Sequence, residues 1–323
     1  MPVSLRRFVF AAASLFGVIH AGTSLANDQP KTPTIMAPTE VIYEHVVHSD
    51  LLGRDMRLLV WKPDHDAPKD GYPVIYSFDG ETSITALAEF AAQAEVLGAR
   101  YKLGAPMVVA FAEMPGDYSH EQRMYDFTPF AKTYELHERP NMLEWPKLGG
   151  GDTYLEAVMT EFKPFIAQTY AIDKDRETLF GHSLGGMLVL HMLATRPDAF
   201  DAYVAVSPSL WFNTPQRFDE ISTLLADPGF APARPVPLMM TVGADESDLT
   251  KWDMRLPEDM RSRRLEWKKI NAMVDNARKM AGVIAKEGAG KIDLDFSVLD
   301  RTNHHTAKPI TMYRAIEMAM TPR

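Results

Sequence analysis

The sequence contains no cysteine, which excludes disulfide bonds, thiolate metal sites and a cysteine nucleophile. It also lacks an excess of basic residues, because 34 Lys and Arg stand against 43 Asp and Glu for a formal net charge of −9. Since phosphate binding requires clustered positive charge, nucleic acid is not expected as a partner. The apolar run Phe8–Ile19 is shorter than the roughly 20 residues that a membrane-spanning helix needs, so no span is expected in the mature chain.

The amino terminus has the pattern of a secretory signal peptide. Arg6 and Arg7 precede the apolar run, and small residues follow it up to Ala26. We therefore expect residues 1–26 to be cleaved and the mature protein to be periplasmic or secreted, the alternatives being a retained anchor or a buried helix. Residues 27–40, rich in Pro, Thr and polar side chains, are expected to form a flexible lead-in.

The remainder, residues 41–323, is expected to form a single domain. Short β-branched or apolar segments alternate there with segments of helical pattern, which is typical of an α/β domain with a mostly parallel central sheet and helices on both faces. Two polar segments, 113–151 and 248–264, interrupt the alternation and either frame a pocket or form exposed loops. The expected strands are Met56–Trp61, Val74–Phe78, Met107–Phe111, Thr178–Gly181, Tyr203–Val206, Leu238–Val242 and Leu294–Leu299, and the expected helices include Tyr154–Ile166, Gly185–Thr195 and Trp267–Lys286.

A G-x-S-x-G motif lies between one of these strands and a helix. In that context Ser183 is the candidate nucleophile, because a sharp strand-to-helix turn lifts its hydroxyl clear of the sheet. Such a turn leaves room only for very small residues two positions before and after the serine, which Gly181 and Gly185 satisfy. The backbone N–H of Leu184, at the helix N-terminus, can stabilise a developing oxyanion. We expect the side chain of His182 to pack under the turn.

The base that activates Ser183 is expected to be a histidine that follows it in the chain. His191 lies eight residues further along the same helix, about 12 Å along its axis, and is therefore interpreted as a packing residue. That leaves His304 and His305, in the loop after the last expected strand. We favour His304, although spacing alone does not decide between the two.

The acid partner of the base is expected in the loop that follows the strand Leu238–Val242. Asp245, Glu246 and Asp248 are the carboxylates of that loop. In many hydrolases the acid comes three residues after the glycine that ends the strand, here Gly243, which selects Glu246. Asp245 is the alternative, and a dyad without an acid is also physically possible.

Further candidates concern the oxyanion and the substrate. The backbone N–H of Gly80 or Glu81, after an earlier strand, is the candidate second oxyanion donor, the alternative being an ordinary turn. Trp211 is a candidate substrate-binding residue near the acyl or alcohol group, or a core residue. Arg123 either contacts an anionic substrate or holds its loop to a carboxylate such as Asp126.

Several segments together resemble one esterase branch of the α/β-hydrolases, which includes esterase D-like and siderophore esterases. The resemblance covers roughly residue 41 to the C-terminus. In the terminal histidine motif, His304 aligns with the family histidine, while His305 replaces a usually small residue; the family acid falls on Glu246. The matching segments are Tyr76–Gly80, Arg123–Pro129, Gly149–Leu155, Gly181–Gly186, Ser207–Phe212 and Met273–Arg278.

This resemblance implies an α/β-hydrolase fold and carboxylic ester hydrolysis without metal or organic cofactor. The implied partner is a small-molecule ester, catecholate siderophore trilactones being one class that exported members hydrolyse. An acyltransferase and a catalytically inactive binding or scaffold protein are the alternative functions. Neither the identity of the ester nor the oligomeric state follows from the sequence.

Overall fold

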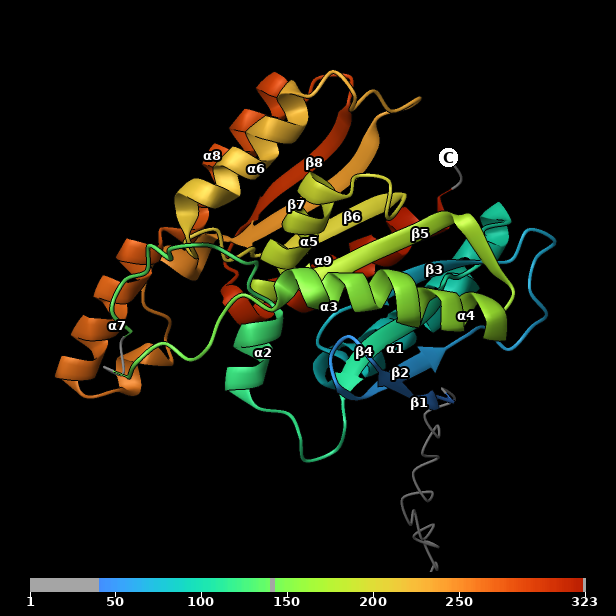
Figure 1. Ribbon diagram of the computed structural model, residues 1–323, viewed down its shortest axis with the longest axis horizontal. Helices are drawn as coiled ribbons and strands as arrows, with labels where there is room; N and C mark the ends of the chain where they lie inside the picture. Colours follow the sequence, from blue (N-terminus) through green and yellow to red (C-terminus); the bar gives the residue numbers. More distant parts are fainter. Residues whose placement is uncertain (1–40, 140–142, 322–323) are drawn as a thin grey trace, which may run out of the picture. The chain divides into compact units, whose positions relative to one another are not determined.

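The computed structural model describes residues 41–139 and 143–321. The predicted signal peptide, residues 1–26, and the predicted lead-in, residues 27–40, lie outside these ranges. Eight strands form one sheet in the order β1-β2-β4-β3-β5-β6-β7-β8 (Figure 1). They are β1 Tyr43–Ser49, β2 Arg54–Trp61, β3 Tyr72–Ser77, β4 Met107–Glu113, β5 Ile172–His182, β6 Ala202–Val206, β7 Val236–Gly243 and β8 Ile292–Leu299.

The sheet is parallel except at one edge. β1 and β2 pair antiparallel, as do β2 and β4, while β3 to β8 run parallel to one another and to β4. The carboxyl ends of parallel strands meet at the same edge, where open α/β sheets bind their ligands. Residues that follow β5, β7 and β8 are therefore brought together there.

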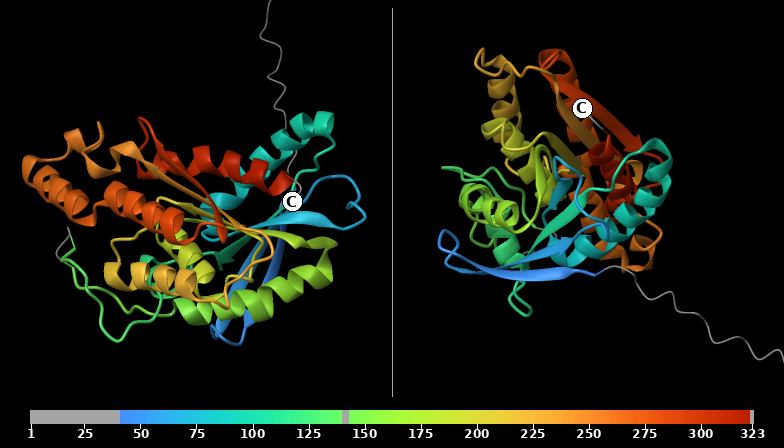
Figure 2. Two further views of the ribbon diagram at one scale, coloured as in Figure 1. Left: turned by 90° about the horizontal axis from the view of Figure 1, so that it is seen from above. Right: turned by 90° about the vertical axis from the view of Figure 1, so that its right-hand side faces the viewer.

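Helices cover both faces of the sheet, which confirms the predicted α/β-hydrolase arrangement (Figure 2). Apolar side chains of α1 and α9 form the core on one face, and those of α3, α4, α5, α6 and α8 form the core on the other. The helices are α1 Gly80–Gly98, α2 His120–Asp126, α3 Gly151–Ala157, α4 Lys163–Thr169, α5 Leu184–Thr195, α6 Thr214–Ala226, α7 Glu258–Asn271, α8 Met273–Glu287 and α9 His304–Met320; a π-helical turn, Val158–Phe162, joins α3 to α4.

The predicted single helix Trp267–Lys286 is wrong, because two helices occupy that range. Ala272 has a left-handed backbone conformation, with φ of 44°, and this breaks the chain between α7 and α8. β1 was not predicted; most of its residues are exposed or half-buried, as befits an edge strand with little apolar signal. The last residues of the charged segment 248–264 form the beginning of α7, a helix that extends beyond the sheet in Figure 1.

His191 lies in α5 and packs between neighbouring helices, as predicted. Its Nε2 lies 2.9 Å from an oxygen of Asp152 in α3, and its Nδ1 lies 3.0 Å from an oxygen of Glu220 in α6. Burial alone would lower the pKa of His191, but these two hydrogen bonds outweigh it and raise the pKa above its ordinary value. The imidazole thus links three helices on one face of the sheet.

Among the described helices, none is both long enough and apolar enough to cross a lipid bilayer.

Candidate active site

The strand-to-helix turn at Ser183 is strained. Ser183 connects β5 to α5 and has φ of 62° and ψ of −120°, a conformation that non-glycine residues rarely adopt. A Cβ atom on Gly181 would lie 2.2 Å from the carbonyl oxygen of Gly185, so the two backbones are in direct contact. The N–H of Ser183 donates to the carbonyl of Val206 in β6 at 2.9 Å. Packing and this hydrogen bond together hold the turn in place.

Glu246 lies in a short helical turn after β7, and its side chain is only 1% exposed. Oε1 accepts hydrogen bonds from the backbone N–H of Gly243 at 2.7 Å and from the hydroxyl of Ser207 at 2.5 Å. Oε2 lies 2.7 Å from Nδ1 of His304. Burial alone would raise the pKa of Glu246, but the hydrogen bonds from His304, Ser207 and Gly243 lower it below its ordinary value. The carboxylate is therefore held in its charged form.

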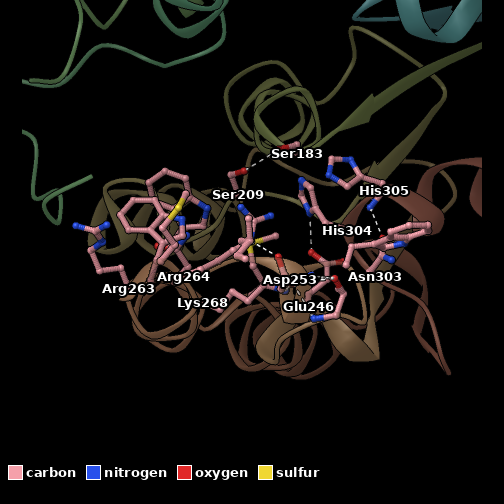
Figure 3. Close-up of a pocket in the computed structure, with 18 residues that line it drawn as sticks. Ser183, Ser209, Glu246, Asp253, Arg263, Arg264, Lys268, Asn303, His304 and His305 are labelled. Carbon is pink, nitrogen blue, oxygen red and sulfur yellow. Dashed lines mark hydrogen bonds and ion pairs between the residues drawn. The ribbon is translucent and has the colours of Figure 1, made fainter. Parts of the chain in front are cut away.

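His304 is the first residue of α9, and a cap fixes the start of that helix. The side chain of Asn303 accepts hydrogen bonds from the N–H groups of His305 and Thr306, and the Asn303 N–H donates one to the hydroxyl oxygen of Thr306. In Figure 3 the His304 imidazole lies between Ser183 and Glu246. Of the two histidines left open by the sequence, His304 is the one that contacts the Glu246 carboxylate.

His305 also lines the cavity at Ser183, with its ring 5.7 Å from that of His304. Burial and the neighbouring His304 lower the pKa of His305. Asp245, the alternative acid, donates its backbone N–H to the carbonyl of Thr302 and thereby ties the acid loop to the segment before α9.

His182 contacts His304, which the sequence did not predict. Its Nε2 lies 2.8 Å from the His304 carbonyl oxygen, and the two rings lie 4.5 Å apart. Burial and the neighbouring His304 lower the pKa of His182 well below its usual range. A neutral His182 therefore packs against the candidate base, and its contact with the His304 carbonyl links the nucleophile turn to α9.

The predicted oxyanion donors lie at the N-termini of two helices. Leu184 begins α5, whereas Gly80 and Glu81 begin α1. A Cβ atom on Gly185 would lie 3.5 Å from Asp79 Oδ2, so the loop before α1 packs against the first turn of α5. The direction of these N–H groups toward an oxyanion stays a prediction.

Arg123 is bound to a carboxylate, as one of the two expectations had it, but that carboxylate belongs to Asp79 and not to Asp126. Its guanidinium donates to both carboxylate oxygens of Asp79, one of these bonds being 2.8 Å long. Asp126 is instead 2.5 Å from the guanidinium of Arg54. Asp79 has φ of 55°, so the Arg123 side chain supports a strained residue directly before Gly80. Arg123 does not line the cavity at Ser183, and its role in substrate binding stays a prediction.

A cavity of about 770 Å³ opens at Ser183, Glu246 and His304. Trp211 lies in its wall, 5.3 Å from the ring of Trp267 in α7. Trp252, Arg263 and Arg264 also line the cavity, so the wall includes part of the charged segment 248–264 that interrupted the strand–helix alternation. Lys268 lines it as well, and Asp253 forms ion pairs with Arg264 and Lys268.

No group of three His, Asp or Glu side chains within residues 41–139 and 143–321 is arranged to hold a metal ion.

Comparison with known proteins identifies relatives of similar length. Residues 49–275 match the model of a family described as "Putative esterase". The chain is 30% identical over 275 residues to the ferri-bacillibactin esterase BesA of Bacillus subtilis, covering 83% of this chain and 86% of that protein. It is 27% identical over 228 residues to a siderophore triacetylfusarinine C esterase of Aspergillus fumigatus, covering 70% and 74% of the two chains.

Solved structures show the same fold. The crystal structure of the BES protein from Bacillus cereus superposes with a TM-score of 0.71 at 25% identity, covering 90% of this chain and 99% of that one. The siderophore hydrolase EstA from Aspergillus nidulans superposes with a TM-score of 0.75 at 21% identity, covering 90% and 96%.

The contact between Gly181 and Gly185 predicts that Gly181→Ala destabilises the protein. The added methyl group meets backbone atoms rather than a movable side chain, so we expect the free energy of unfolding to fall by at least about 2 kcal/mol. Chemical denaturation followed by circular dichroism measures this change.

Gly282→Ala in α8 is the matched control, because no heavy atom other than those of its chain neighbours and its own helix backbone lies within 4 Å of the added Cβ. That variant should gain about 0.5–1 kcal/mol, since alanine favours a helix over glycine. Equal stability of the two variants would contradict the steric role of Gly181.

Proposed function

Because the chain belongs to this esterase family and is a carboxylic ester hydrolase, we propose that it cleaves its substrate through an acyl-enzyme on Ser183. In this mechanism His304 is the general base and Glu246 its acid partner. The observation that carries the proposal is the 2.7 Å contact between His304 Nδ1 and Glu246 Oε2 in the cavity that contains Ser183.

The state of Glu246 determines which nitrogen of His304 can act as the base. A charged carboxylate only accepts hydrogen bonds, so the Nδ1 that contacts it carries a proton. In the neutral imidazole Nε2 then has a free lone pair and can accept the proton of the Ser183 hydroxyl. Once protonated, the imidazolium is stabilised by the carboxylate.

Hydrolysis proceeds in two steps. In the first, Ser183 Oγ attacks the ester carbonyl while its proton moves to His304, and that proton then passes to the departing alcohol. In the second, His304 takes a proton from the water that attacks the acyl-enzyme and passes it to Ser183 Oγ as the carbon–oxygen bond breaks and the acid is released. The tetrahedral oxyanion of each step is stabilised by the N–H of Leu184 and by that of Gly80 or Glu81.

We propose a siderophore ester as the substrate. The names of the relatives, which include a ferri-bacillibactin esterase and siderophore enterobactin esterase, support this class. The tryptophans and cations in the cavity wall also suit an aromatic anion such as a ferric catecholate, since guanidinium groups and tryptophan faces bind planar anionic ligands well. The cavity volume of about 770 Å³ lies within the range that is usual for small-molecule binding sites in proteins.

We further propose that the protein is exported, with the segment up to Ala26 removed. The basic start, apolar run and small residues before the cleavage position support this location.

The assignment of the base predicts a large difference between two adjacent variants. His304→Ala should lower kcat for a p-nitrophenyl ester by about 10⁴- to 10⁶-fold, because Ser183 loses its proton acceptor. His305→Ala should retain most of the activity, since His305 lacks the carboxylate contact of His304.

Both variants are compared with Ser183→Ala and with the unaltered protein by steady-state kinetics and fluorophosphonate labelling. An inactive His305→Ala beside an active His304→Ala would reverse the assignment. Activity that survives Ser183→Ala would contradict the acyl-enzyme itself.

If the substrate is a ferric catecholate, positive charge on the α7 residues that line the cavity should strengthen its binding. Arg263 lines the cavity, so Arg263→Glu should raise KM for a ferric catecholate trilactone by about tenfold while KM for p-nitrophenyl butyrate changes little. Lys269→Glu, an exposed position on the same helix outside the cavity lining, changes the net charge equally and serves as control. Equal effects of both variants would contradict a specific role of the wall.

A further inference from the structure

The segment Ser207-Pro208-Ser209, which the sequence singled out without a role, connects the acid to the nucleophile. It follows β6, and its backbone is hydrogen bonded on two sides. The N–H of Ser207 donates to the carbonyl of Thr241 in β7 at 2.7 Å, and the N–H of Ser209 donates to the carbonyl of Ser183 at 3.0 Å. Ser207 has φ of 43°, a left-handed conformation that turns the chain sharply between these anchors.

Both hydroxyl groups of this segment contact members of the proposed triad. Ser207 Oγ donates to Glu246 Oε1, as described above. Ser209 Oγ lies 3.3 Å from Ser183 Oγ, a contact marked by a dashed line in Figure 3. Ser209 is only 2% exposed and lines the cavity at Ser183. Its hydroxyl is therefore held beside the Ser183 oxygen by a side chain that is itself almost completely buried.

We propose that Ser209 is a further catalytic residue, whose hydroxyl donates a hydrogen bond to Ser183 Oγ and stabilises the negative charge that develops there. This proposal rests on the proposed function, in which Ser183 is the nucleophile. In the proposed mechanism the Ser183 proton goes to His304, which leaves the lone pairs of Ser183 Oγ free to accept from Ser209. When Ser183 donates to His304 during the reaction, the hydrogen bonds run in one direction, from Ser209 through Ser183 and His304 to Glu246, and the bonds of such a chain strengthen one another.

The proposed hydrogen bond from Ser209 stabilises negative charge on Ser183 Oγ in both acylation and deacylation. In acylation the Ser183 proton moves to His304 Nε2, and the electron pair on Oγ forms the bond to the carbonyl carbon. In deacylation that carbon–oxygen bond breaks, the electron pair returns to Oγ, and Oγ takes a proton from His304. Ser209 keeps its own proton throughout, so it stabilises charge on the oxygen without entering the proton balance.

The test compares Ser209→Ala with the unaltered protein on p-nitrophenyl butyrate. We expect the burst rate, which reports acylation, and kcat to fall about tenfold each, as is typical of one lost hydrogen bond, whereas KM stays within about twofold. Rates are normalised to active sites counted by complete fluorophosphonate labelling, so that unfolded protein does not contribute.

The pH dependence of kcat shows whether Ser209 acts on the Ser183 oxygen or on the His304 imidazole. Because Ser209 contacts Ser183 and not His304, the profile of Ser209→Ala should keep its shape and fall by the same factor at every pH. Ser49→Ala is the matched control, since Ser49 is equally buried and hydrogen bonded, to Glu161, but lies outside the cavity lining. It should leave both rates unchanged.

Two results would overturn the proposal. Unchanged rates per active site in Ser209→Ala would mean that the hydroxyl has only a packing role. Faster rates would mean that Ser209 accepts the Ser183 hydrogen and holds it away from His304. Failure of the proposed function itself is recognised separately, because the unaltered protein would then show neither a burst nor labelling that depends on Ser183.

Discussion

The direct contact between the backbones of Gly181 and Gly185 is the constraint on which the candidate active site depends. It allows β5 to pass into α5 within a single residue, so that Ser183 adopts a strained conformation at the carboxyl edge of the sheet. Such strain persists only where the surroundings hold it. Here α5 is buried along nearly its whole length, and β6 accepts a hydrogen bond from Ser183 itself. The apolar core and the reactive position are therefore one structural unit.

Parallel strands bring the remaining groups to the same edge. The segments after β6, β7 and β8 contribute Ser209, Glu246 and His304, and the strand register places these segments side by side. A charge as deeply buried as that of Glu246 is costly unless it is hydrogen bonded. Three donors from three different segments meet this requirement, and one of them is the imidazole. The same bonds that stabilise the carboxylate thus orient His304.

The sequence predicted the sheet strands and the turn at Ser183 well, because buried parallel strands are continuous apolar runs and the turn requires glycines at set positions. The edge strand β1 and the break at Ala272 escaped prediction. β1 lacks a strong apolar pattern, and a left-handed alanine has no marker in the sequence. The sequence predicted a carboxylate partner for Arg123 but did not identify Asp79, which lies 44 positions away and is brought to Arg123 only by the fold.

The choice between His304 and His305, and the contacts of His182 and Ser209, likewise depend on tertiary structure. Adjacent residues at the start of a helix point in different directions, and spacing does not reveal which one meets the acid. Hydroxyl and imidazole side chains in a loop carry no periodic pattern, although the repeated serines of Ser207-Pro208-Ser209 were a visible signal. The sequence shows which reactive side chains follow each strand. Which of these side chains contact one another is determined by the fold.

Mass spectrometry of a rapidly quenched reaction shows most directly whether the Ser183 hydroxyl forms a covalent ester with the substrate acyl group. With an activated ester in excess, we expect one added acyl mass per chain, located on the peptide that contains Ser183 and lost with time as the ester hydrolyses. Rapid turnover with no acylated Ser183 at any quench time, or with the acyl group on another residue, would contradict the proposed acyl-enzyme.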